Sequence, residues 1–162
     1  MILNNYINDI SSLQNLSIDG DSQYQNDTVS FEDFMNKIKQ DLNSKMVGLS
    51  FSNSNFTENH LNLISQYISI KKIQALEFHN SFSNKTVVDF FINTFLTSLQ
   101  QCPDFTSLYI DEVEALDYDK LLKNVPQQIK SLSIVNCDIP INQILNTIKT
   151  DSKFSNNLSV LN

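Results

Sequence analysis

Two pairs of side chains have the types and the spacing needed for acid–base or metal chemistry. Glu77 and His79 are two residues apart, and so are Tyr109 and Asp111. Side chains alternate between the two faces of a strand, so each pair projects from one face if its segment is extended. An imidazole beside carboxylates can transfer protons or bind a metal ion. The alternative is that these are ordinary solvated polar side chains on a sheet surface, without a chemical role.

No other catalytic pattern occurs in the sequence. It contains no C-x-x-C and no G-x-S-x-G, and its only glycines, Gly20 and Gly48, are too few for a phosphate-binding loop. The second histidine, His60, falls in the first turn of an expected helix and is expected to be an ordinary surface residue. We therefore expect a protein without a cofactor or a resident metal.

The segments that would position the two pairs recur along the chain. Each unit has an apolar residue, two spacers, a second apolar residue, one spacer and a third, as in Ile129, Leu132 and Ile134. Successive units begin 24 to 33 residues apart, a periodicity typical of stacked repeat architectures. Short strands are therefore expected near residues 13–18, 46–51, 73–78, 105–110, 129–134 and 158–161.

Amphipathic helical patterns separate these expected strands. Thr57 is expected to cap one helix, and Thr86 with Asp89 to form the capping pair of the next. A further short helix is expected over residues 117–125, where Pro126 would end it. Strand alternating with helix also suits a doubly wound α/β sheet. However, the strands are short and have nearly the same pattern of apolar residues, which favours a stack of similar repeats.

The helix expected between residues 86 and 102 is apolar over much more than one stripe. An apolar patch left on its outer side would mark a docking surface. The alternative, which we favour, is that flanking helices and the loop at 81–85 cover it.

These units resemble leucine-rich repeats, whose pattern is L-x-x-L-x-L-x-x-N/C-x-L. Their lengths are most similar to the ribonuclease-inhibitor-like subclass, which has a helix in each repeat. The resemblance implies a single α/β domain over residues 1–162, folded as a right-handed, horseshoe-shaped solenoid of about five repeats. Short parallel strands would line the concave side and helices the convex side.

The repeats depart from the family pattern at the ninth position. Only Cys137 has one of the residues that the family places there, and the other copies carry Asp21, Ser54, Ser81 and Val113. The hydrogen-bond ladder that the family builds at this turn is therefore expected to be irregular, and the Val113 side chain cannot join it. The array is degenerate.

Composition excludes several classes of partner. The chain has 162 residues, 41% of them hydrophobic, which suits one folded domain. A net charge of −7 and the absence of arginine argue against nucleic acid, and no apolar stretch is long enough to span a membrane. The N-terminal residues lack the features of a signal or transit peptide, and two cysteines do not make a disulfide framework. A cytoplasmic protein is expected.

The resemblance implies that the concave face binds the partner, because solenoids commonly bind there and tyrosine is a favoured anchor. An acidic rim formed by Glu112 and Glu114 would attract a basic partner. On the concave face, the expected partner-binding residues are Asp19, Glu77, His79, Tyr109, Asp111 and Val135.

These expectations combine into a non-enzymatic scaffold or adaptor that binds another protein. They leave open a ubiquitin-ligase adaptor, a secreted bacterial effector and a structural subunit of a large assembly. The chain starts in a helical half-repeat and stops within a strand, so its ends are expected to pack against further repeats or a neighbouring subunit. The alternative function is a metal-dependent or hydrolytic enzyme that uses Glu77, His79 and Asp111.

Overall fold

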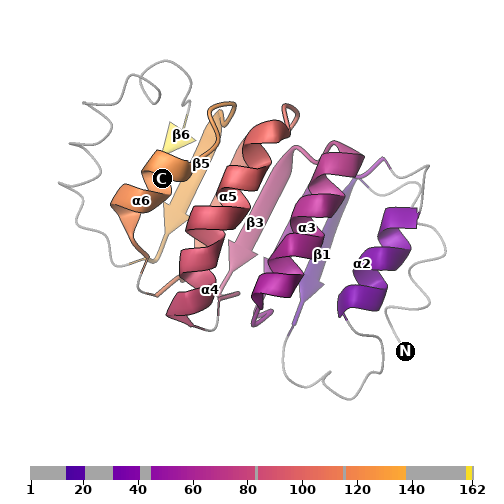
Figure 1. Ribbon diagram of the computed structural model, residues 1–162, viewed down its shortest axis with the longest axis horizontal. Helices are drawn as coiled ribbons and strands as arrows, with labels where there is room; N and C mark the ends of the chain where they lie inside the picture. Colours follow the sequence, from indigo (N-terminus) through magenta and orange to yellow (C-terminus); the bar gives the residue numbers. More distant parts are fainter. Residues whose placement is uncertain are drawn as a thin grey trace.

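The structure of the protein is a computed structural model, which describes residues 14–20, 31–40, 45–82, 84–114, 116–137 and the backbone of 160–161. Strands and helices alternate along these residues, so the fold is α/β (Figure 1). The strands are β1 (Asn15–Asp19), β2 (Gly48–Ser52), β3 (Ala75–His79), β4 (Ser107–Asp111), β5 (Ser131–Val135) and β6 (Val160–Leu161). The α-helices are α2 (Phe31–Gln40), α3 (Glu58–Lys71), α4 (Lys85–Phe90), α5 (Leu96–Ser98) and α6 (Tyr118–Asn124).

The six strands form one parallel sheet in the order of the chain. The second apolar residue of each repeat is the Cα partner of its counterpart in the next strand. One column therefore contains Leu16, Leu49, Leu76, Leu108, Leu132 and Leu161. This is the register that the recurring motif predicts, because identical spacing brings identical positions side by side.

Each strand starts two residues after the first apolar residue of its motif. Met46, Ile73, Phe105 and Ile129 precede β2, β3, β4 and β5 in this way and are at most 3% exposed. The motif therefore includes one buried residue from the loop that leads into each strand. This shifts the observed strands toward the C-terminus relative to the ranges expected from the sequence.

The helices of the described residues all lie on one face of the sheet (Figure 1). The strand side chains that face them are buried in β2 to β5 and partly buried in β1, and Leu49, Leu76, Leu108 and Leu132 are at most 2% exposed. The alternate strand residues lie on the other face and, apart from the buried Gly48, are exposed or half-buried. We call this the open face. It is made of Ser17, Asp19, Ser50, Ser52, Glu77, His79, Tyr109, Asp111, Ser133 and Val135.

Phe78 lies at the centre of the core between the sheet and the helices. Its ring stacks on that of Phe51, with centroids 5.8 Å apart, and meets Phe91 edge-on at 5.4 Å. Phe56 and Phe95 also contact it edge-on. These rings come from two successive repeats, so the aromatic contacts join one coil to the next.

The helical segment after β3 covers the core along most of its length. Its buried apolar residues recur every four positions: Val87, Val88, Phe91, Ile92, Phe95, Leu96 and Leu99. A four-residue period drifts around an α-helix, but here the turn Phe91–Phe95 is π-helical and wider, which offsets the drift. The apolar residues of this helix are therefore covered, as the favoured alternative predicts, and Phe90, its remaining large apolar residue, is half-buried.

The helix starts are partly those expected. Thr57 caps α3, where its hydroxyl accepts a hydrogen bond from the His60 N–H, so that prediction is confirmed. The prediction of a Thr86–Asp89 capping pair is wrong. The N-cap of α4 is Asn84, whose backbone is extended and whose Oδ1 accepts from the Val87 N–H at 3.1 Å.

The short helix α6 lies within the range expected for it. Its N-cap is Asp117, and Val125 ends it just before Pro126. None of the helices in the described ranges is both long and apolar enough to cross a lipid bilayer.

The turns that follow the strands repeat one hydrogen bond. The residue after each strand donates its backbone N–H to the last carbonyl of the next strand, from Gly20 to Ser52 at 2.8 Å and from Asn53 to His79 at 2.9 Å. Asn80 and Glu112 continue the series at 3.0 and 3.2 Å. The chain therefore turns away from the sheet at the same level in each of these coils.

Candidate functional site

The two residue pairs singled out from the sequence meet on the open face. Glu77 and His79 belong to β3, and Tyr109 and Asp111 belong to the adjacent β4. Glu77 and Tyr109 are Cα partners, and so are His79 and Asp111. The predicted juxtaposition of these four side chains follows directly from the parallel register of the sheet.

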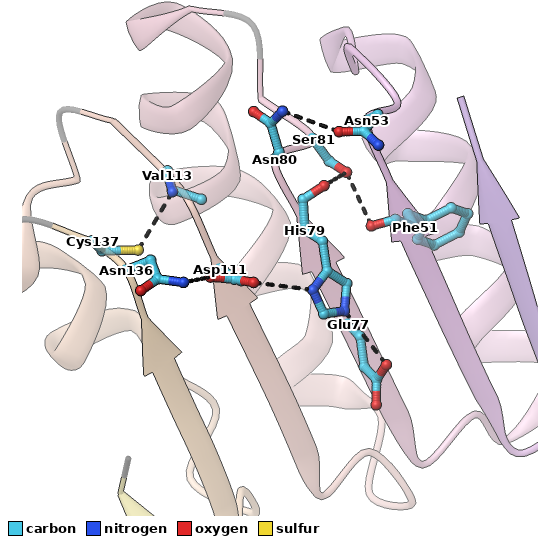
Figure 2. A network of polar contacts seen from close by, with 10 residues as sticks. All are labelled: Phe51, Asn53, Glu77, His79, Asn80, Ser81, Asp111, Val113, Asn136 and Cys137. Atoms are coloured by element: carbon cyan, nitrogen blue, oxygen red, sulfur yellow. Dashed lines mark hydrogen bonds and ion pairs between the residues drawn. The ribbon is translucent and has the colours of Figure 1, made fainter. Parts of the chain in front are cut away.

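His79 contacts all three of the other residues. Its Nδ1 lies 3.3 Å from Asp111 Oδ2, and its Nε2 lies 3.7 Å from Glu77 Oε2 (Figure 2). Its ring lies over that of Tyr109, with centroids 4.8 Å apart and planes tilted by 36°. The imidazole is therefore held between two carboxylates and against a phenol ring, with about a third of its side chain still exposed.

Asn136, which the sequence analysis did not single out, lies just after β5 and extends this arrangement to a third repeat. Its Nδ2 donates to Asp111 Oδ1 at 3.0 Å, and His79 contacts the other oxygen of the same carboxylate (Figure 2). Both oxygens of Asp111 therefore have a partner, and a polar chain runs from β3 through β4 to the end of β5. Such cross-strand contacts fix side chains that would otherwise sample several rotamers.

The surroundings of Tyr109 are negative. Burial raises the pKa of its phenol above the ordinary value of 10.0, and the charges of Asp111 and Glu77 raise it further. The hydroxyl therefore stays protonated at neutral pH and can donate or accept a hydrogen bond. It offers an aromatic surface with a polar end, the combination that makes tyrosine common in binding interfaces.

Of the other predicted binding residues, Val135 adjoins these four and the rest lie apart from them. Asp19 is on β1, two strands from His79, and accepts a hydrogen bond from Asn53 Nδ2 at 3.3 Å. Val135 is half-buried beside Asp111 as its Cα partner on β5. Glu112 and Glu114 are exposed in the turn after β4. The open face thus has a centre at β3 and β4, with Asp19 and the acidic rim at its margins.

A second set of asparagines lies along the upper edge of the open face. Asn80 Nδ2 donates to Asn53 Oδ1 at 3.0 Å, and Asn53 in turn donates to Asp19 (Figure 2). Asn53, Asn80 and Asn136 each follow a strand and have a positive φ, between 43° and 50°. Asparagine at the eighth position of three repeats was a usable signal in the sequence, because asparagine tolerates this backbone conformation.

The ninth position carries an irregular polar ladder, as expected. The hydroxyl of Ser81 lies 3.0 Å from the Phe51 carbonyl and 2.8 Å from that of His79, so it joins two coils. Cys137 accepts a hydrogen bond from the Val113 N–H at 3.4 Å. The Val113 side chain does not take part, but its backbone does. These contacts hold the turns that carry His79, Asp111 and Asn136.

The arrangement could support two kinds of chemistry. Histidine oriented by a carboxylate can act as a base, and a rigid polar and aromatic surface can bind a partner. Within the described residues, no group of three or more His, Cys, Asp or Glu side chains has the geometry to hold a metal ion.

Neither a scan against protein-family models nor a search of curated proteins returned a match to this chain.

Proposed function

We propose that this protein is a non-enzymatic scaffold that binds another protein through the centre of its open face. The contact surface consists of Glu77, His79, Tyr109 and Asp111, with Asn136 holding Asp111 in place. The acidic residues Glu112 and Glu114 border it. The open face is a side of the sheet that the helices leave uncovered (Figure 1).

One observation carries this proposal. The polar chain from His79 through Asp111 to Asn136 fixes side chains from three neighbouring repeats before any partner arrives. A surface that is already ordered loses little side-chain entropy on binding, so more of the contact free energy appears as affinity. Tyr109 supplies the large amphipathic ring that typically anchors such surfaces.

We further propose that the coils are leucine-rich repeats of the ribonuclease-inhibitor-like kind, stacked in a right-handed arc with the open face on its concave side. The column of leucines, the helix after each of β2, β3 and β4, and the polar residues at the ninth position support this proposal. In such an arc the strand side chains of neighbouring coils converge on one extended surface.

A cytoplasmic location is part of the same proposal. Both cysteines, Cys102 and Cys137, are buried free thiols, which suits a reducing compartment. The roles that remain open within it are an adaptor, an effector and a structural subunit. In each of them the partner is a protein.

The second candidate is an enzyme or metal protein centred on His79. The 3.3 Å contact between His79 and Asp111 favours it, because a carboxylate commonly orients a catalytic imidazole. However, Asp111 is also bound to Asn136, and His79 lies against Tyr109, so both side chains already serve the cross-strand arrangement. Calorimetry with zinc or manganese tests this candidate, since heat of binding that is lost in His79→Ala would support it.

Affinity capture from the source cells tests the scaffold. Tagged protein is compared with Tyr109→Ala and Asp111→Lys, and with Ile70→Ser as the control on the helical side, where Ile70 is 52% exposed. Circular dichroism first establishes that each variant is folded. The proposal predicts that proteins captured by the unmodified chain and by Ile70→Ser are lost from both open-face variants. An unchanged set in the open-face variants would refute the assignment of this face.

A further inference from the structure

The ring pair at the centre of the open face stands among short side chains. His79 and Tyr109 lie face to face at a tilt, with centroids 4.8 Å apart. On the β2 side, the Cα partner of His79 is Ser52, and on the β5 side the partner of Tyr109 is Ser133. Because serine side chains are short, the two rings rise above their neighbours and can be approached from the open face.

In the residues that the structure describes, no lysine neutralises the carboxylates beside these rings. In the described part of the chain, the basic group within 4.0 Å of Glu77 and Asp111 is the imidazole of His79. Half of the Glu77 side chain is exposed, whereas Asp111 is 17% exposed and bound on both oxygens. None of the strand positions on the open face is a lysine.

The pKa of Tyr109 is a second sign of this negative surface. After burial, the largest causes that raise this pKa are the charges of Asp111 and Glu77, which means that both carboxylates act on the phenol. A cation placed over the rings would interact with the two carboxylates and with the ring faces at the same time.

We propose that the centre of the open face is a seat for an arginine side chain that the partner protein presents. The guanidinium would stack on the Tyr109 and His79 rings and donate hydrogen bonds to Glu77 and to the free lone pairs of Asp111. Arginine suits the seat better than lysine, because its planar group can stack on a ring and bind a carboxylate in the same orientation. This inference rests on the proposed function and names what the partner contributes.

The smallest probe of this seat is N-acetyl-arginine amide. The isotope-labelled chain is titrated with it and followed by amide chemical shifts in NMR spectra. Saturable shifts are expected at residues 77–79 and 109–111, and N-acetyl-norleucine amide, which has a similar stem without the charge, should not produce them. Glu77→Gln and Tyr109→Ala should each weaken binding about two- to fivefold. The control Asp19→Asn, which removes a carboxylate from the same face but outside the seat, should not.

Three results would overturn the inference. They are shifts that do not saturate, equal shifts with norleucine amide, and equal affinity for N-acetyl-lysine amide. The proposed function has a separate test, because the capture experiment does not depend on arginine. If the arginine probe fails while Tyr109→Ala still loses the captured protein, the seat is wrong and the binding face stands.

Discussion

Asn80 donates a hydrogen bond through its Nδ2 to Oδ1 of Asn53, 3.0 Å away in the turn of the preceding coil. Asn53 in turn donates a hydrogen bond through its Nδ2 to Asp19 in the coil before it. Asn136 occupies the same repeat position in a later coil and also has a positive φ. The series is interrupted at Glu112, which has the same left-handed backbone, with φ of 54°, but not the same side chain. The left-handed backbone at Glu112 therefore lowers the stability of this turn relative to the turns that carry asparagine.

Replacing Glu112 by asparagine should stabilise the protein. The left-handed conformation is unfavourable for most side chains and better tolerated by asparagine, and a new amide could bond to those of Asn80 and Asn136. We expect the free energy of unfolding, measured by urea denaturation, to rise by about 0.5–1 kcal/mol. Glu114→Asn is the control, because Glu114 is exposed without a positive φ. Equal effects of the two substitutions would show that only the charge matters.

Gly20→Ala should destabilise the protein although Gly20 has no positive φ. A Cβ at this position would lie 2.7 Å from both the Asn53 carbonyl oxygen and the Ser54 Cα, and this backbone cannot move without disturbing the turn. We expect a loss of about 1–3 kcal/mol in the free energy of unfolding. At Gly48 the Cβ would meet mainly the Asn15 side chain, which can rotate away, so Gly48→Ala should cost much less. Equal losses would contradict this account of the turn.

His60 should make stability depend on pH. Burial lowers its pKa below the ordinary value of 6.5, against a smaller opposing effect of Glu32. Its Nδ1 accepts the Thr57 N–H, which requires the neutral ring. Below pH 6.5 the unfolded chain therefore binds the proton more readily than the folded chain, and the free energy of unfolding falls as the pH falls.

The variant His60→Gln isolates this effect. Glutamine can accept the same hydrogen bond at this position but does not titrate. Denaturation curves between pH 7 and pH 5 should show that the unmodified protein loses about 0.5–1 kcal/mol more than the variant. If the two proteins lose stability in parallel, the capping role assigned to the neutral His60 ring is wrong.

Phe78→Ala should be among the most damaging core substitutions. Phe78 is fully buried and contacts rings of the preceding coil, such as Phe51, and of its own coil, such as Phe91. We expect urea denaturation to show a loss of about 3–5 kcal/mol, and a smaller loss for Phe78→Leu. Phe82→Ala, at a half-buried neighbour, should cost clearly less. A similar cost at both positions would mean that the contacts between coils do not converge on Phe78.

The sequence was sufficient to predict the sheet and the meeting of the candidate residues. Leu49, Leu76 and Leu108 have the same apolar neighbours at the same spacing, and in a parallel sheet this spacing fixes both the register and the face of every residue. The positions of Glu77 and Tyr109 side by side follow from that register. In a repeat structure, the spacing of the motif is thus enough to predict which residues of neighbouring strands lie side by side.

The details that the sequence analysis missed depend on contacts between coils. Asparagine at position 84 and threonine at position 86 are both residue types that suit a helix N-cap. We attribute the choice of Asn84 to the packing of Val87 and Val88, in the first turn of α4, against the core. The π-helical turn at Phe91–Phe95 likewise results from burying more apolar residues than one α-helical stripe can hold. Asn136 was missed because its partner, Asp111, belongs to another repeat.

Photo-cross-linking from the open face is the most direct test of the binding site. A benzoylphenylalanine residue is placed at position 109, and in a separate protein at position 70, the exposed site on α3. After irradiation in the source cells, the account predicts a cross-linked partner from position 109 and none from position 70. A partner that cross-links from position 70 but not from position 109 would contradict the central claim that the open face is the contact surface.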